Sequence, residues 1–299
     1  MVTGAMTGVF SAAPTGLVFV NTGTGQVNLG ASNAGTYTVT NSISATAGCP
    51  AVSATASITI NALPTVVVPL DISVCNNEMV PAISFLGVPF STVVSWSNSN
   101  TSIGLGASGT GTIASFTAVN TGTVPVTATI TLTPSANNCI GSDTSFTITV
   151  NPTPAAVVPS DITVCNGAAV PAMSFTSQTP GTSFTWTNSN TAIGLAASGT
   201  GNIASFTAVN TTNTPVSATI SVTPTANGCT GSVSDYTITV NPSPMAIVPS
   251  DTSICHGAAV PGAVFTSTIS GATFTWTNSS PSIGIPASGS GNVPSFTAA

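Results

Sequence analysis

The chain has 299 residues, of which only 2% are charged: six Asp or Glu, no Lys or Arg, and one His, for a net charge of −6. An ordinary soluble domain carries roughly a quarter charged residues. Because no cation is present to neutralise phosphate, the composition excludes nucleic-acid binding and electrostatic attachment to an anionic membrane. Apolar residues alternate with Thr and Ser and never run on for the ~18 residues of a spanning helix, so membrane insertion is not expected.

One stretch of sequence recurs at intervals of 90 residues and divides the chain. In its middle copy it reads SFTWTNSNTAIGLAASGTGNIASFTAVN, and Trp96, Trp186 and Trp276 mark the three copies. A tandem repeat predicts one structural unit for each copy. We therefore expect repeats at 61–150 and 151–240, a truncated repeat at 241–299, and the C-terminal part of a divergent repeat at 1–60. Proline-containing junctions such as Asn151-Pro152-Thr153-Pro154 are typical of short, semi-rigid links.

Taken in order, residues 1–60 end in the strand-like ASITI, which aligns with SFTITV and DYTITV further along the chain. In the copy 151–240, strands are expected over 162–165, 171–175, 183–187, 192–195, 203–209, 215–224 and 235–240. Alternation is clearest near the end, where Val216, Ala218, Ile220 and Val222 are predicted to point inward. One buried and one wet face indicate an antiparallel sandwich. The predicted fold class is all-β, with tandem immunoglobulin-like β-sandwich domains in a linear array.

Six cysteines fall alternately 26 and 64 residues apart without a CxxC pair. This spacing indicates structural disulfides and an oxidising, extracytoplasmic setting. We expect one disulfide within each complete repeat, Cys75–Cys139 and Cys165–Cys229, which leaves Cys49 and Cys255 unpaired. The rival pairing joins neighbouring repeats through Cys49–Cys75, Cys139–Cys165 and Cys229–Cys255.

The remaining candidate residues favour structural roles. Trp96, Trp186 and Trp276 could stack on sugars, but their spacing from inward-facing Phe residues predicts a place in the sandwich core. The three recurring carboxylates, Asp71, Asp161 and Asp251, are expected at turns or strand starts, because each copy has too few acidic residues for a calcium site. His256 stands where the other copies have Asn, as in a surface turn. No catalytic set is visible, so we expect no enzyme activity, no metal and no cofactor.

A resemblance follows from the frame PxxxxPxDxxVCNG, then WTNSNxxIGLxASGTGxIASFTAVN, ATIxVTPxANxCxGS and FTITVNPxP. This frame resembles the PKD-like or Ig-like repeats of very large secreted surface proteins of the Bacteroidetes. The resemblance implies an exported, type IX secreted protein at the cell surface, often adhesive, in which these domains serve as a structural stalk or filament segment. A module that binds glycan or another protein is the alternative. No signal peptide is visible, so we expect a segment of a longer protein.

The expected partners are the neighbouring repeats of the same chain and a surface glycan or protein. The third copy lacks its last two strands, and the N-terminal region supplies similar ones. Strand complementation would then join chains head to tail.

Overall fold

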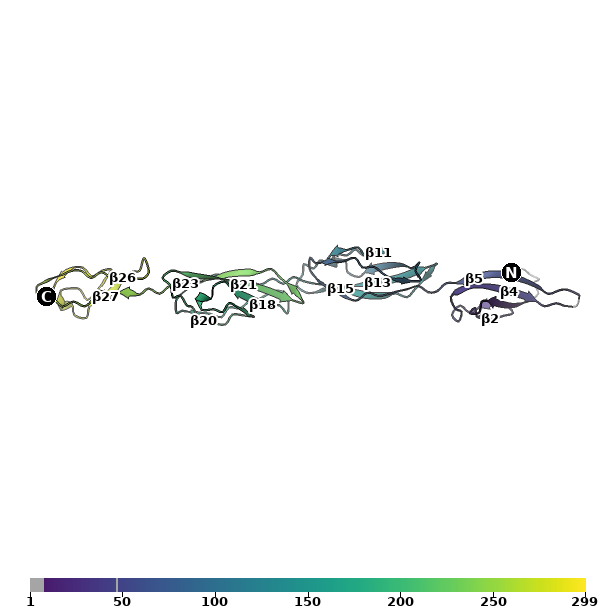
Figure 1. The fold of residues 1–299 in the computed structure, drawn as a ribbon, viewed down its shortest axis with the longest axis horizontal. Coiled ribbons are helices and arrows are strands. Elements are labelled where there is room, and N and C mark those ends of the chain that lie inside the picture. The colour runs from purple at the N-terminus through teal and green to yellow at the C-terminus, as the bar shows by residue number, and fades with distance from the viewer. Residues whose placement is uncertain (1–7, 47) are drawn as a thin grey trace. The chain divides into compact units, whose positions relative to one another are not determined.

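The computed structural model describes residues 8–46 and 48–299, which fold as strands and short 3-10 turns (Figure 1). No α-helix occurs in that part of the chain. The residues divide into two compact units, Met1–Asn151 and Pro152–Ala299. Each unit holds one complete domain and one smaller group of strands, and the all-β, immunoglobulin-like fold class is confirmed.

The first complete domain, residues 61–151, is built on a six-stranded sheet with the order β11-β10-β13-β15-β7, in which β14 pairs with β13. Its strands are β6 (Thr65–Val66), β7 (Ile72–Cys75), β8 (Met79–Val80), β9 (Gly87–Val88), β10 (Val93–Asn98), β11 (Ser108–Thr110), β12 (Phe116–Thr117), β13 (Val126–Ala136), β14 (Cys139–Ile140) and β15 (Thr144–Asn151). The short pairs β6–β9 and β8–β12 form the second layer.

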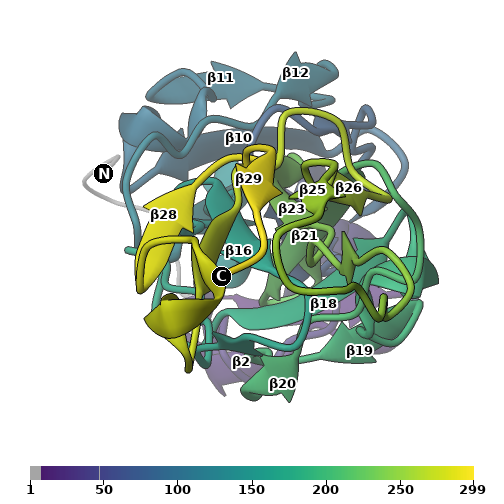
Figure 2. The same cartoon turned by 90° about the vertical axis from the view of Figure 1, so that its left-hand side faces the viewer.

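The second complete domain, residues 152–241, repeats this sheet in the order β16-β23-β21-β18-β19, with β22 on β21. Figure 2 labels the five strands of that path. Its strands are β16 (Ile162–Cys165), β17 (Ala169–Val170), β18 (Ser183–Asn188), β19 (Ser198–Thr200), β20 (Phe206–Thr207), β21 (Val216–Ala226), β22 (Cys229–Thr230) and β23 (Ser234–Asn241). The alternation expected for 216–223 is confirmed, because Ala218, Ile220 and Val222 are buried and the residues between them are not.

Two strands expected in this copy are absent, for local reasons. Residues 191–193 form the 3-10 turn η2 (Thr191–Ile193), because the Asn190 side chain accepts a hydrogen bond from Ala192 N–H and Gly194 closes the turn with φ +93°. Residues 171–175 contribute only a bridge from Met173 to Ile203. The first domain has the matching turn η1 (Thr101–Ile103).

Outside the complete domains the strands are fewer. Residues 8–46 and 48–60 hold a sheet of three strands, β1 (Val9–Ala13), β4 (Gly35–Ile43) and β5 (Val52–Ile60), and the pair β2 (Phe19–Asn21) and β3 (Gln26–Val27). Residues 242–299 hold three strand pairs and the turn η3 (Pro281–Ile283). Those pairs are β24 (Ala246–Ile247) with β26 (Thr266–Ser267), β25 (Ala259–Val260) with β29 (Phe296–Thr297), and β27 (Thr275–Thr277) with β28 (Ser288–Ser290).

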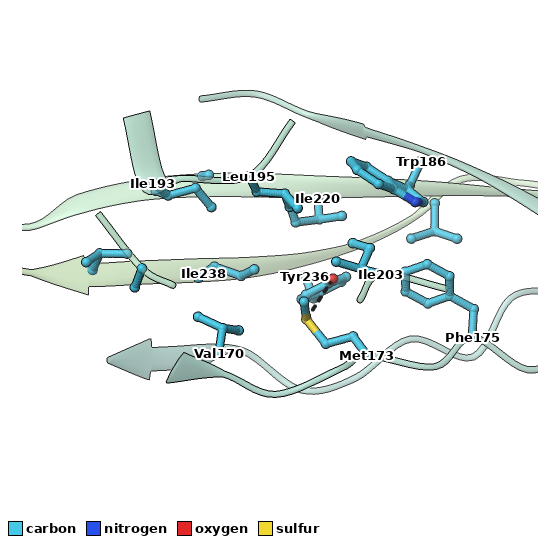
Figure 3. Packing of buried hydrophobic residues seen from close by; sticks show 14 residues of the cluster. Val170, Met173, Phe175, Trp186, Ile193, Leu195, Ile203, Ile220, Tyr236 and Ile238 are labelled. Atoms are coloured by element: carbon cyan, nitrogen blue, oxygen red, sulfur yellow. Dashed lines mark hydrogen bonds between the residues drawn. The ribbon is translucent and has the colours of Figure 1, made fainter. Parts of the chain in front are cut away.

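The core of each complete domain lies between the main sheet and the layer of short pairs. In the second domain it includes the labelled side chains of Figure 3, which point toward one another from both layers: Val170, Met173, Phe175, Trp186, Ile193, Leu195, Ile203, Ile220, Tyr236 and Ile238. Burying one such aliphatic side chain contributes ~1.5–3 kcal/mol, so these residues are the main source of the domain's stability.

Candidate functional site

The first and last strands of each complete domain lie side by side and run parallel. In the first domain β7 pairs with β15, with Ile72 opposite Ile148 and Cys75 opposite Asn151. In the second domain β16 pairs with β23 in the same way, from Ile162 to Cys165. We call each of these parallel pairs the terminal-strand clamp. In each complete domain the first and last strands are therefore joined directly by one ladder of backbone hydrogen bonds.

Each domain is entered at one pole and left at the other. The N-terminal pole of the first domain comprises Pro64 and the hairpin 134–141, where the space beside Gly141 is filled by the Pro64 carbonyl oxygen. The C-terminal pole contains Asn151, whose carbonyl oxygen accepts a hydrogen bond from Asn76 N–H at 2.8 Å. The second domain repeats both features, with Pro154 beside Gly231 and Asn166 bonded to Asn241.

The recurring aspartates extend the clamp at its start. Thr147 N–H donates to Asp71 Oδ1, and Thr237 N–H donates to Asp161 Oδ1, each at 2.7 Å. The backbone hydrogen bond from Thr147 lowers the pKa of Asp71 below its usual value of 3.8. These carboxylates thus satisfy N–H groups of the last strand.

An asparagine that sequence reasoning missed closes each C-terminal pole. Asn210 is 3% exposed, and its Nδ2 donates to the carbonyl oxygens of Thr214 and Val240 at 2.8 and 2.7 Å. Its Oδ1 accepts from Thr212 N–H at 2.9 Å. Asn120 makes the corresponding bonds in the first domain, including one to Val150 O at 2.7 Å. The signal in the sequence is the exact repetition of FTAVN at both places.

The cysteines differ from both expected pairings. Cys75 and Cys229 are disulfide-bonded, whereas Cys49, Cys139, Cys165 and Cys255 carry free thiols. Neither Cys75–Cys139 nor Cys165–Cys229 forms, and the rival bonds Cys49–Cys75, Cys139–Cys165 and Cys229–Cys255 do not form either.

The register of the strands explains why the expected pairs fail. Cys75 lies level with Asn151 at one end of β15, and the hairpin that carries Cys139 lies beyond Thr144 at the other end. Seven steps of ~3.3 Å along that strand separate the two levels by about 23 Å. A disulfide requires Cα atoms within ~7 Å. Cys165 and Cys229 are held apart in the same way by β23.

Each tryptophan lies against a glycine of the neighbouring strand. Trp186 is 7% exposed and belongs to the core cluster, and Trp96 packs against the core of the first domain. A Cβ placed on Gly199 would meet the Trp186 ring at 2.3 Å. All three indole Nε1 atoms, including that of Trp276, are buried without a hydrogen-bond partner. The ring edge that carries each Nε1 is therefore enclosed by protein.

Tyr236 is the one tyrosine of the two complete domains, and it is buried in the second core. Its hydroxyl donates to Met173 Sδ at 3.1 Å, as the dashed line in Figure 3 shows. Desolvation by burial raises the pKa of Tyr236 to about 12. The neutral phenol is therefore the form that the folded domain favours.

Residues 8–46 and 48–299 contain no group of three or more His, Cys, Asp or Glu side chains that could hold a metal ion. Asp251 and His256 are both exposed, in a segment without strand structure. In the same residues no helix has the length and apolar character needed to cross a membrane.

The outer face of the main sheet is lined with hydroxyl groups. Thr127 and Thr149 are hydrogen-bonded across strands at 2.9 Å, and Ser217 and Thr239 repeat this bond at 2.9 Å. The N-terminal region has the pair Thr36–Thr59 at 3.1 Å. Hydroxyl pairs of this kind stabilise a wet sheet face without any charge.

The N-terminal poles of the two complete domains differ in polarity. The first domain exposes three apolar side chains there, Leu63, Phe90 and Ile140, and Phe90 is 100% exposed. At the matching positions, 90 residues later, the second domain has Thr153, Pro180 and Thr230. The two poles thus present different surfaces to whatever lies before each domain.

Three solved structures are similar to this chain at low sequence identity. Extracellular cadherin domains 1–4 of protocadherin gamma B7 are 12% identical, with a TM-score of 0.41 over 97% of this chain and 83% of that one. A three-domain immunoglobulin segment of titin is 14% identical, with a TM-score of 0.40 over 79% of this chain and 87% of that one. Mouse cadherin-23 EC22-24 is 10% identical, with a TM-score of 0.35 over 79% and 86%.

No curated protein matches the chain. One protein family matches part of the chain. Residues 162–244, from β16 to just beyond β23, match the PKD-like domain family.

Proposed function

We propose that this chain is a tension-bearing spacer, a stalk or filament segment of a large extracellular surface protein of the adhesin kind, without catalytic activity. The observation that carries the proposal is the terminal-strand clamp, which joins the first and last strands of each complete domain in parallel. Chain entry and exit at opposite poles let such domains transmit tension from one to the next.

Parallel terminal strands resist pulling because of the direction in which their hydrogen bonds are loaded. Tension on the two ends of the domain slides β7 along β15, so the bonds of the ladder must break together. Antiparallel terminal strands would instead open one bond at a time. Asp71 and Asn76 add bonds at the two ends of the ladder, so the loaded set is longer than the strand pair alone.

The surface and the cysteines support a place outside the cell. Disulfides persist in oxidising compartments, and Cys75 and Cys229 are disulfide-bonded. Since the chain has no Lys or Arg, it offers no cleavage site to trypsin-like proteases. An exported protein of the Bacteroidetes type would benefit from both properties.

A second candidate function is a module that binds a protein or glycan. It is favoured by the apolar N-terminal pole of the first domain, where Leu63, Phe90 and Ile140 are exposed together. Aromatic and aliphatic side chains exposed as a group are typical of recognition surfaces. Replacing Phe90 with Ser would abolish such binding and leave the clamp unchanged.

Single-molecule pulling of the reduced chain tests the spacer function. We expect one high-force unfolding event for each complete domain, each releasing about 3.6 Å of chain for every residue unfolded. Asp71→Ala should lower the unfolding force of the first domain only. Asp143→Ala is the matched control, because Asp143 accepts a hydrogen bond from Thr133 at the hairpin, outside the clamp. Equal effects of the two variants, or unfolding of both domains at low force, would refute the proposal.

A further inference from the structure

The sequence contains two Asn-Gly pairs, and both lie in the second complete domain: Asn166-Gly167 at the C-terminal pole and Asn227-Gly228 in the hairpin of the N-terminal pole. At this dipeptide the backbone nitrogen of the glycine can attack the preceding side-chain amide, because glycine has no side chain to shield that nitrogen. The first domain has Asn76-Asn77 and Asn137-Asn138 at the matching positions. The second domain therefore has the two turns at which this reaction is least hindered.

Asn227 and Gly228 form the two-residue turn between β21 and β22, and both are exposed. Their φ angles are +51° and +79°, as in a type I′ hairpin turn. The turn is closed by the ladder pair Ala226 and Cys229, which does not involve the peptide bond between Asn227 and Gly228. That central peptide can rotate transiently to the type II′ turn without breaking the ladder. In type II′ the ψ of Asn227 is about −120°, which brings the Gly228 nitrogen toward Asn227 Cγ.

The other pair, Asn166-Gly167, is held at each group that the reaction must move. Gly167 N–H donates to Ala208 O at 2.8 Å, so rotation of the peptide between Asn166 and Gly167 breaks a backbone hydrogen bond. Asn166 Oδ1 accepts from Asn210 N–H at 2.9 Å, which fixes the side-chain amide. Asn166 N–H donates to Asn241 O at 2.8 Å, at the end of the terminal-strand clamp. Attack at Asn166 therefore requires the C-terminal pole to open.

We propose that Asn227 is a site of spontaneous deamidation in the folded protein, whereas Asn166 is protected by the hydrogen bonds of the C-terminal pole. The Gly228 nitrogen forms a bond to Asn227 Cγ as the Cγ–Nδ2 bond breaks, and the proton of the Gly228 N–H leaves with Nδ2 as ammonia. Water then opens the five-membered succinimide at either carbonyl, which yields aspartate or isoaspartate. The net reaction consumes one water and releases one ammonia, so solvent is the co-reactant.

The product changes both the charge and the length of the turn. One added carboxylate changes the formal net charge from −6 to −7, and the chain has no Lys or Arg to pair with it. Isoaspartate also adds one main-chain atom between residues 227 and 228, which a two-residue turn cannot accommodate without loss of the pair between Ala226 and Cys229. The hairpin of the second domain therefore changes with age, while that of the first domain, with Asn138 in place of glycine, keeps its turn. This inference does not depend on the proposed mechanical function.

Peptide mapping over a time course tests the site directly. The native chain is kept in mildly alkaline buffer, samples are cleaved with pepsin, and mass spectrometry follows the peptides that contain Asn166 and Asn227. We expect Asn227 to convert at least about tenfold faster than Asn166, which corresponds to ~1.4 kcal/mol of additional protection at Asn166. In urea, where both turns are unfolded, the two rates should converge. Similar rates in the native chain, faster conversion of Asn166, or a difference that persists in urea would overturn the proposal.

The first domain supplies a matched control variant. Gly228→Asn gives the second hairpin the turn residues of the first, and Asn138 shows that asparagine is accepted at this position, with φ +61°. The variant should slow conversion at Asn227 to the rate of Asn137 and leave Asn166 unchanged. Isoelectric focusing of the intact chain should show an additional acidic band as the native chain ages, and this band should be delayed in the variant. No delay would show that the Gly228 nitrogen is not the attacking group.

Discussion

Replacing Asn210 with Ala removes the side chain that closes the C-terminal pole of the second domain. The bond to Val240 O is buried, so its loss leaves a carbonyl without a partner at a cost of ~1–3 kcal/mol. The bonds with Thr212 and Thr214 lie closer to solvent, and water can replace them at a cost of ~0.5–1 kcal/mol together. The total cost is ~1.5–4 kcal/mol. A domain of this size loses ~4–8 °C in Tm for each kcal/mol, so we expect its transition to fall by at least ~6 °C.

Differential scanning calorimetry of the reduced chain measures this change domain by domain. Asn210→Ala should shift one transition, and Asn120→Ala should shift the other, because Asn120 has the same role in the first domain. Asn213→Ala provides the control, since Asn213 is exposed. A shift for Asn210→Ala no larger than that for the control would show that the buried amide is not needed to hold the pole.

Three further predictions concern other residues. Gly199→Ala should destabilise the second domain by ~1–3 kcal/mol in urea unfolding, because the new methyl group meets the Trp186 ring at 2.3 Å; no change would place that ring outside the core. Absorbance titration should show a tyrosine midpoint near pH 12 that is absent from the Tyr236→Phe variant. The stability that the raised pKa provides should be lost as pH rises from ~10 to about 12. A tyrosine midpoint near pH ~10 alone would contradict the burial of Tyr236. The lowered pKa of Asp71 contributes stability that is present above pH ~4 and is lost as pH falls through the pKa of the folded state. The unfolding force of the first domain should therefore drop in acid for the native chain, and it should not drop for the Asp71→Ala variant.

The repeat and its alternation were sufficient to predict the fold class, because every strand of the main sheet buries one face and the period of two is visible in the sequence. Strand β21 shows this most clearly, with Ala218, Ile220 and Val222 inward. The strand expected over 192–195 was wrong because a short apolar run looks the same in a strand and in a 3-10 turn. The turn was decided by Asn190 and Gly194, whose local backbone preferences outweigh the apolar pattern.

The predicted disulfide pairings were wrong for a different reason. Spacing in sequence shows that Cys75 and Cys139 belong to one repeat, but only the register of β7 and β13 against β15 shows that they lie at opposite poles. The function of Asp71 as a partner of Thr147 N–H also depends on that register. Sequence alone could identify the strand-start position of the aspartates but not the strand that they bind.

The difference in polarity between the two N-terminal poles has a consequence for recombination between the repeats of such a gene. Copies this alike invite unequal recombination, which adds or removes whole repeats. A crossover between the two copies would exchange Leu63, Phe90 and Ile140 of the first domain's pole for Thr153, Pro180 and Thr230, or the reverse. A change in repeat number would therefore change how many apolar poles an array presents, while the sheet order that both copies share stays the same.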